Sequence, residues 1–149
     1  MKKRIILFLI ICSIILTGCI NNNNQAKENN KNEKSDLKMT EIKAKIHDKT
    51  YKLNLENNQT VEEFIDILPQ EYMMNELNGN EKYVYISESL TTNIYQPKKI
   101  EKGDVMLYGD NCLVIFYESF ETNYRYTKIG HIDNLPDLGK ENIKISFEK

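Results

Sequence analysis

The sequence is short of the residues that build disulfide frameworks and metal sites. Its 149 residues include three cysteines, two histidines and no tryptophan. Cys12 and Cys19 belong to the N-terminal segment, which leaves Cys112 without an intramolecular partner and excludes a disulfide framework. His47 and His131 are far apart and lack the cysteines or acidic residues that would complete a zinc site. We therefore expect neither a metal nor a cofactor.

Positive charge is not concentrated anywhere beyond the first few residues. The 20 lysines and arginines face 22 acidic residues, which gives a formal net charge of −2. After the basic N-terminus, Arg125 is the only arginine and the lysines are scattered. Binding to nucleic acid, or electrostatic docking on anionic lipid, needs clustered positive charge. Nucleic acid is therefore excluded as a partner.

The N-terminus has the parts of a secretory signal. Residues 2–4 are basic and precede an apolar run that is shorter than the roughly 20 residues a membrane-spanning helix needs. The run ends in Leu16-Thr17-Gly18-Cys19, which resembles the lipobox of bacterial lipoproteins. That resemblance implies cleavage before Cys19, diacylglycerol on its sulfur and usually an acyl chain such as palmitate on its new amino group.

The composition divides the chain into three segments. Residues 1–18 are the predicted lipoprotein signal peptide, residues 19–38 are the lipidated cysteine and an Asn-, Lys- and Glu-rich tether, and residues 39–149 are a folded domain. The tether has almost no apolar residue, so it cannot bury enough surface to offset the entropy of ordering it. The expected location is the extracytoplasmic face of the cell membrane, which the protein contacts through its lipid anchor alone.

Alternating apolar residues predict two antiparallel hairpins in the domain. The alternation between Ile42 and Leu55 is broken by a turn at Asp48-Lys49, as is typical of a hairpin with one wet face. The second hairpin is predicted at Tyr72–Leu77 and Lys82–Ile86, because the Asn-Gly pair between them is the strongest short hairpin signal.

One helix is predicted between these hairpins. Apolar residues recur at helical spacing from Val61 to Leu68, and Pro69 ends the pattern. Thr60 is expected to cap the helix while Glu63 reaches back to it, as in a capping box. We expect this helix to cover an open side of the sheet.

The centre of the domain is predicted in residues 103–130. Apolar runs at Val105–Tyr108 and Cys112–Tyr117 flank a Gly-Asp-Asn turn, which predicts a hairpin with both faces largely covered. Cys112 is expected to be a small core residue. Further strands are predicted at Thr127–Ile132 and near the C-terminus, with a helical turn between them. About eight strands with one or two short helices make a mainly β domain and favour a closed barrel.

Several of these segments together resemble the bacterial cyclophilin-like domain proteins. The resemblance extends from about Met39 to Glu148 and implies a small, closed β-barrel with the cyclophilin fold. Cyclophilins themselves isomerise peptidyl-proline bonds with an arginine in a Phe-x-x-Arg-type segment, which this chain lacks, so no catalytic residue is carried over. The residues that carry the resemblance are Leu68-Pro69, Leu77–Tyr83, Gly103–Val114, Phe116–Phe120 and Tyr124–Gly130.

The candidate ligand site is the aromatic and hydroxyl-rich end of this central segment. Aromatics of a barrel belong to its core by default, but alternate residues of a strand point opposite ways, so some of these must face outward. Ser119 lacks the G-x-S-x-G context of a hydrolase nucleophile. We expect a binding cleft with the 87–102 loop at its rim, formed by Tyr108, Phe116, Ser119, Phe120, Tyr124, Arg125 and Tyr126.

The function favoured by the sequence is that of a membrane-tethered binding module. Its expected ligand is a peptide, a glycan fragment or a small molecule held in the aromatic cleft. The alternative that the resemblance implies is a peptidyl-prolyl cis-trans isomerase acting on cell-envelope proteins. A third interpretation is an accessory lipoprotein whose barrel docks onto a protein partner.

Overall fold

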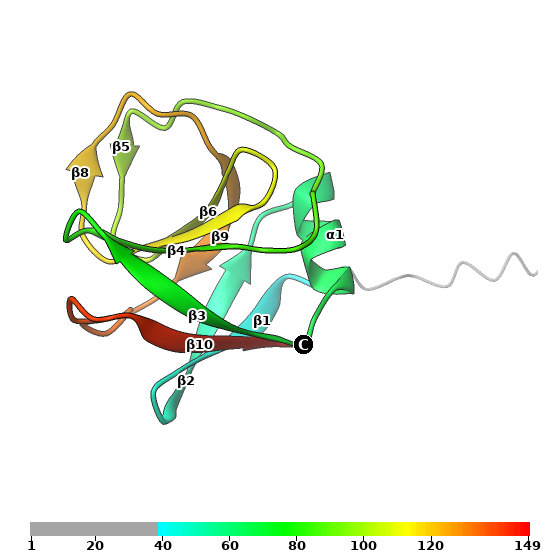
Figure 1. Cartoon of the computed structure of the whole chain (residues 1–149). Coiled ribbons are helices and arrows are strands. Elements are labelled where there is room, and N and C mark those ends of the chain that lie inside the picture. Colours follow the sequence, from blue (N-terminus) through cyan, green and yellow to red (C-terminus); the bar gives the residue numbers. More distant parts are fainter. Residues whose placement is uncertain (1–38) are drawn as a thin grey trace, which may run out of the picture. The chain divides into compact units, whose positions relative to one another are not determined.

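A computed structural model describes residues 39–149, and within them ten strands and one helix (Figure 1). The expected signal peptide, lipidated cysteine and tether lie outside the described residues. Within 39–149, no helix is long and apolar enough to span a membrane. The elements are β1 (Glu41–Ile46), β2 (Lys49–Leu55), α1 (Gln59–Asp66), β3 (Gln70–Leu77), β4 (Glu81–Tyr85), β5 (Lys99–Ile100), β6 (Asp104–Tyr108), β7 (Cys112–Phe116), β8 (Phe120–Glu121), β9 (Thr127–Ile132) and β10 (Ile143–Glu148).

Eight of these strands close into a barrel. Their order is β1-β10-β3-β4-β7-β6-β9-β2, and every neighbouring pair is antiparallel. The predicted mainly β fold, a closed barrel of about eight strands, is therefore confirmed. The seam joins the first and last strands, with Lys43 opposite Glu148 and Ile46 opposite Ile145. The remaining strands, β5 and β8, pair with each other to one side of the barrel (Figure 1).

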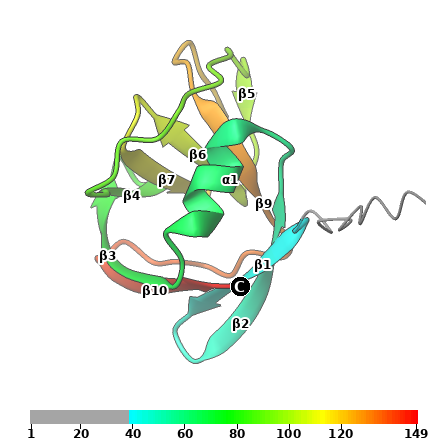
Figure 2. The same cartoon turned by 90° about the vertical axis from the view of Figure 1, so that its right-hand side faces the viewer.

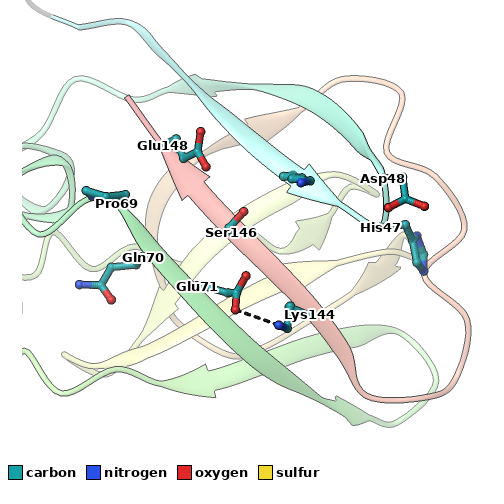
Figure 3. Close-up of a pocket in the computed structure, with 9 residues that line it drawn as sticks. His47, Asp48, Pro69, Gln70, Glu71, Lys144, Ser146 and Glu148 are labelled. Atoms are coloured by element: carbon teal, nitrogen blue, oxygen red, sulfur yellow. Dashed lines mark ion pairs between the residues drawn. The ribbon is translucent and has the colours of Figure 1, made fainter.

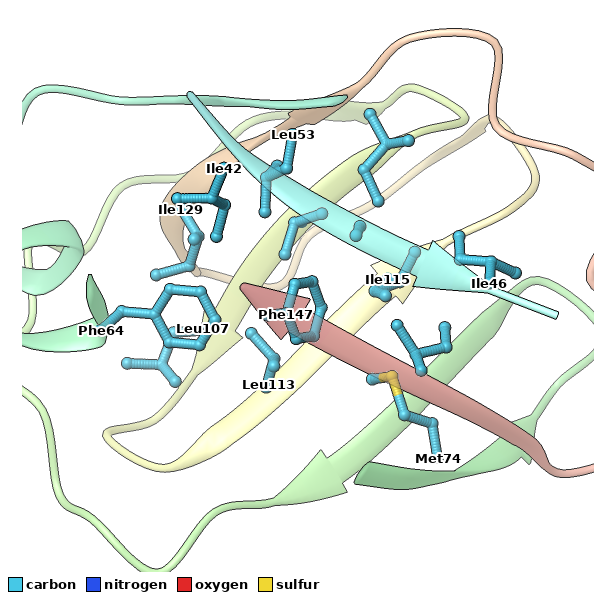
Figure 4. Close-up of a cluster of buried hydrophobic side chains, with 14 of the residues drawn as sticks. Ile42, Ile46, Leu53, Phe64, Met74, Leu107, Leu113, Ile115, Ile129 and Phe147 are labelled. Carbon is cyan, nitrogen blue, oxygen red and sulfur yellow. The ribbon is translucent and has the colours of Figure 1, made fainter. Parts of the chain in front are cut away.

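The barrel interior is filled by apolar residues that occupy alternate positions along the strands. Ile42, Ala44 and Ile46 of β1 are buried, whereas the residues between them are exposed. The buried residues of neighbouring strands meet in one cluster with Phe147 among them (Figure 4). The ring of Phe147 lies edge-on to that of Phe64 in α1, with 5.6 Å between the ring centroids. Because alternate strand residues face opposite sides, the period-two pattern alone places these side chains inside.

Helix α1 lies across one end of the barrel, as expected (Figure 2). The predicted capping box, however, is wrong. The cap is Asn58, whose side chain accepts a hydrogen bond from the Val61 N–H at 3.0 Å. Thr60 is buried and donates to the Thr91 carbonyl at 2.6 Å, and Glu63 accepts from the Thr91 N–H at 2.6 Å. Asn caps a helix at least as well as Thr, and Thr60 lies within the helix, where its hydroxyl bonds to Thr91 instead.

The hairpin of β6 and β7 is covered on both faces, as predicted. Its inward residues, among them Leu107 and Leu113, belong to the main core. Its outward residues form a second buried cluster with Ile100 of β5 and Tyr126. Cys112 is buried in this second cluster, which confirms its role as a small packing residue. The outward members from the hairpin are Met106, Cys112, Val114 and Phe116.

Two connections differ from the prediction. The 87–102 segment, expected as a long loop, contains β5 and an isolated bridge between Tyr95 and Tyr126. The connection between β9 and β10 contains no helical turn; instead Leu135 and Leu138 are buried in the main core. Burial of these leucines, rather than local helical hydrogen bonds, therefore fixes that connection.

A buried ion pair binds the β9–β10 connection, which lies opposite α1 in Figure 1. Lys82 is fully buried on the face of β4 that also carries Val84, a residue packed against the core. Its ammonium donates to Glu76 at 2.5 Å and to the carbonyls of Gly139 and Glu141, each at 2.8 Å. All three donor positions of the ammonium are thus satisfied, as a buried charge requires.

Candidate functional site

The candidate site is a groove of about 280 Å³ on the outer surface of the barrel. We name it the tyrosine groove because five of its lining residues are tyrosines. It lies over β4, β7 and the end of β6, and its remaining walls come from the end of β3 with the following turn and from the segment before β9. The lining residues are Leu77, Asn78, Glu81, Tyr83, Tyr85, Tyr108, Cys112, Val114, Tyr124 and Tyr126.

Strand register places the floor of the groove and two of its walls. Cys112 of β7 is opposite Tyr85 on β4 and opposite Tyr108 on β6. Directly opposed residues of an antiparallel pair point to the same face, so these three side chains form a row across three strands. Tyr83 stands beside Val114 in the same way. The small Cys112 and Val114 side chains therefore lie low between taller tyrosine rings.

The tyrosine rings meet nearly at right angles. The ring centroids of Tyr83 and Tyr85 are 6.0 Å apart with an interplanar angle of 83°, and those of Tyr108 and Tyr124 are 6.1 Å apart at 88°. Tyr108 also contacts Tyr126, at 5.7 Å. The first two pairs have the edge-to-face arrangement that aromatic pairs prefer, whereas the rings of Tyr108 and Tyr126 are tilted at 56°. The groove thus presents ring faces and edges in more than one direction.

Exposure separates the tyrosines that a ligand could touch from those that support them. Tyr85 is 66% exposed, Tyr124 64% and Tyr108 47%, whereas Tyr126 is only 5% exposed. Tyr126 is held beneath the others by its ring contact with Phe116 at 5.5 Å and by its backbone hydrogen bonds with Tyr95. Tyr126 is therefore a supporting residue, and the other three offer free surface.

One carboxylate, that of Glu81, gives the groove a negative character. Burial, followed by the charge of Glu76, raises the pKa of the half-buried Glu81 carboxyl. Burial and then the charge of Glu81 raise the pKa of Tyr126 to about 12 and raise the pKa of the Cys112 thiol. Cys112 is thus kept protonated and is not suited to nucleophilic chemistry. None of the residues that line the groove is cationic.

The structure brings together three of the seven predicted site residues in this groove: Tyr108, Tyr124 and Tyr126. Phe116 is fully buried, and Phe120 packs against it with ring centroids 5.6 Å apart, so both lie in the second cluster rather than in the groove. No residue between 87 and 102 lines the groove.

The two polar members of the predicted site lie elsewhere. The Ser119 hydroxyl accepts a hydrogen bond from the Lys102 N–H at 2.8 Å and donates one to Glu101 at 3.1 Å. Its role is therefore to hold the turn at residues 101–102 against the segment after β7. Arg125 is exposed and does not line the groove.

Sequence reasoning missed the contribution of β4. Glu81, Tyr83 and Tyr85 alternate with buried or inward residues and so share one face of the strand. That period-two pattern of tyrosines is visible in the sequence. The pairing of β4 with β7, which brings this face beside Cys112, is a long-range contact that the pattern does not reveal.

A larger depression, of about 560 Å³, lies on the outer face of β1, β10 and β3 (Figure 3). Figure 3 shows polar side chains standing along the three strands, with an ion pair of 3.0 Å between Lys144 and Glu71. The side chains of this pair are 61% and 58% exposed. Such solvated charges are typical of the solvent-exposed face of a sheet. This depression is therefore a weaker candidate for a ligand site than the tyrosine groove.

A polar cluster around Asp104 has a structural explanation. The carboxylate accepts from the Glu101 N–H at 3.0 Å and lies 3.1 Å from His131 Nδ1 and 3.3 Å from Lys128 Nζ. It therefore closes the turn before β6, and its neighbours satisfy its buried charge. Within residues 39–149 there is no group of three or more His, Cys, Asp or Glu side chains placed to hold a metal ion.

Comparison with known proteins bears on the whole domain. No curated protein and no solved structure gives a significant match to the chain. The model of the cyclophilin-like family matches residues 44–148, which span the barrel from β1 to β10. The chain therefore belongs to the cyclophilin-like family, as the resemblance of its motifs predicts.

Proposed function

We propose that this protein is a ligand-binding module, anchored in the membrane by lipid on Cys19, that holds a small organic molecule or a peptide side chain in the tyrosine groove. The observation that carries the binding role is the exposure of Tyr85, Tyr108 and Tyr124 around an apolar floor. Exposed aromatic surface gathered in one concave place marks interaction sites, because leaving it in water is unfavourable.

The rigidity of the groove also supports this role. Its floor is part of β7, which is fully buried and paired on both edges. Its deepest tyrosine, Tyr126, is fixed by ring contacts and a backbone bridge. A preformed site loses little conformational entropy when a ligand enters, so even a small groove can bind usefully. Its volume suits a single small molecule or side chain rather than a folded partner.

The lipid anchor rests on the sequence alone, because residues 1–38 lie outside the described part of the chain. The pattern Leu16-Thr17-Gly18-Cys19 after an apolar run of signal length supports it. Processing of this kind supplies two or three acyl chains, which is enough for stable anchoring, whereas a single chain binds only marginally. The groove would then work outside the cytoplasm, on ligands of the cell envelope or its surroundings.

A library of peptides, sugars and metabolites tests the binding role. A ligand of the groove should raise the thermal midpoint of the wild-type protein, because it binds the folded state. Tyr124→Ala should lose that rise. Tyr95→Ala, which removes another partly exposed tyrosine that does not line the groove, should keep it. A library with no stabilising compound, or a rise unaffected by Tyr124→Ala, would count against the proposal.

The alternative activity, prolyl isomerisation, is tested separately with a proline-containing peptide. The single arginine of the domain does not line the tyrosine groove. We therefore expect the interconversion to keep its uncatalysed time course of tens to hundreds of seconds. A faster rate that is lost in Arg125→Ala would make isomerisation the better explanation.

A further inference from the structure

The chemistry of the tyrosine groove narrows the class of ligand it can hold. The groove combines five aromatic side chains with a single carboxylate, and none of its lining residues carries a positive charge. We propose that its ligand is an organic cation of the quaternary ammonium type, with the cation against the tyrosine rings and beside Glu81. This inference rests on the proposed binding function and specifies the ligand for it.

The state of Glu81 is the first argument. Among the described residues, its carboxylate has no hydrogen-bond donor and no cation as a partner, although it is half-buried. The neighbouring acid on β3, Glu76, shows the contrast, because Lys82 and Tyr117 both donate to it. A ligand that covers Glu81 with neither a positive charge nor a hydrogen-bond donor would remove water from a carboxylate and return nothing. A cationic ligand would supply the missing partner.

The tyrosine rings are the second argument. The face of an aromatic ring carries negative electrostatic potential, so it attracts a cation that has shed its water. Tyr108 and Tyr124 form one right-angled pair at this groove. The pair of Tyr83 and Tyr85 repeats this arrangement on β4. Recognition of quaternary ammonium groups by several aromatic rings is a general use of this geometry.

The type of cation follows from the apolar floor of the groove. A primary ammonium has three N–H donors that need acceptors once water is removed. The floor of the groove offers Cys112 and Val114, which are weak or apolar partners. A quaternary ammonium has no N–H group, so it loses little by leaving water and gains contact with the rings. The groove volume of about 280 Å³ accommodates such a head group with a short chain.

The test compares choline with its neutral isostere, 3,3-dimethylbutan-1-ol. The full-length protein is kept in a maltoside detergent, because detergents with choline head groups would compete. Each compound is titrated while the ring signals of ¹³C-labelled tyrosine are followed by NMR. Choline should bind about tenfold or more tightly than the isostere. It should also bind more tightly than Nα-acetyl-lysine amide, which carries a primary ammonium.

Variants assign the binding to the groove. Glu81→Gln, which keeps the volume and removes the charge, should weaken choline binding about tenfold and leave binding of the neutral isostere unchanged. Glu71→Gln removes an exposed glutamate outside the groove and should leave choline binding as it is. Should Glu81→Gln fail to fold, Tyr85→Leu serves instead, because its side chain is largely exposed.

The outcomes separate this inference from the proposed function. Equal affinities for choline and its isostere, with changes in the NMR signals of the groove tyrosines, would overturn the inference that the ligand is a cation. A neutral ligand would then be the better assignment for the same site. Tighter binding of the lysine derivative would overturn the quaternary type. If none of the three compounds binds, the inference is overturned, whereas the binding role itself is decided by the library screen.

Discussion

The ammonium of Lys82 and the carboxylate of Glu76 lie 2.5 Å apart at directly opposed positions of the β3–β4 hairpin, with the lysine fully buried. The same carboxylate accepts from the Tyr117 hydroxyl, whose ring lies 5.0 Å from the ammonium, and from the Gly79 N–H. This network joins the hairpin, the end of β7 and the β9–β10 connection. It places an ion pair where a strand pattern would normally place an apolar residue.

Removal of the cation should be costly. Lys82→Met is expected to lower the free energy of unfolding by about 3 kcal/mol, because it leaves the Glu76 charge and two loop carbonyls without their donor. Lys144→Met is the matched control, since it breaks an exposed ion pair and should cost under about 1 kcal/mol. Urea unfolding of both variants measures the difference. Equal costs would mean that burial of the Lys82 pair contributes nothing.

The pH dependence of stability should carry the signature of Glu76. Burial alone would raise the pKa of this carboxyl, but the hydrogen bonds from Lys82, Tyr117 and Gly79, together with the lysine charge, lower it below its usual value. A carboxyl with a depressed folded-state pKa stabilises the protein above its unfolded pKa of about 4.3, and this contribution is lost as the pH falls through the folded pKa. Urea unfolding between neutral and acid pH should therefore show that the free energy of unfolding falls less with acidification in Glu76→Gln than in wild type. Parallel profiles would contradict this.

Two neighbouring tyrosines should respond oppositely to truncation. Tyr126→Ala is expected to cost about 3 kcal/mol of folding free energy, because its ring is buried against Phe116. Tyr124→Ala should cost well under about 1 kcal/mol, because its ring is mostly exposed, and should weaken ligand binding instead. Thermal unfolding with and without ligand measures both. A large loss of stability in Tyr124→Ala would make it a packing residue.

The close approach of β2 and β9 depends on Gly130. A Cβ there would lie 2.1 Å from the Asn54 carbonyl oxygen, so Gly130→Ala must push two paired strands apart. We expect a loss of about 3 kcal/mol in urea unfolding. Gly139→Ala, whose φ of +62° is also unfavourable for alanine but whose Cβ would meet open space, should lose only about 1 kcal/mol. Similar losses would mean that the two strands can separate without cost.

The proposed lipid anchor predicts that Cys19 decides membrane attachment. Cys19→Ser should leave the precursor uncleaved or release the protein from the membrane, and should abolish labelling with radioactive palmitate. Cys12→Ser, within the apolar run of the same segment, should change neither. Cell fractionation distinguishes these outcomes, and unchanged membrane attachment of Cys19→Ser would end the lipoprotein proposal.

Local patterns predicted the parts of the fold that depend on neighbouring residues. Asn78 and Gly79 both adopt positive φ, of 57° and 73°, as the hairpin signal requires. The helix, by contrast, is capped by Asn58, whereas Thr60, the expected cap, is buried and bonds to Thr91, a contact between segments that no local pattern contains. Long-range contacts therefore account for the errors.

The candidate site shows the same difference between local patterns, which were predicted, and long-range contacts, which were not. Sequence reasoning identified Tyr108, Tyr124 and Tyr126, which lie in or beside the predicted central hairpin. It missed Tyr83 and Tyr85, because their proximity depends on the order of strands around the barrel. Phe116 and Phe120 were included because the 87–102 segment was expected as a long loop, whereas β5 in that segment pairs with β8 and covers the second cluster.

The position of β10 between β1 and β3 ties folding to the order in which the chain is made. The six residues of β10 form the last strand of the domain to be synthesised, yet they supply the hydrogen-bonding partners of both neighbours. Until they arrive, the sheet has two free edges, and unpaired edges invite association with other chains. The barrel can therefore close only once β10 is present, so the strand that is made last in the domain completes its folding.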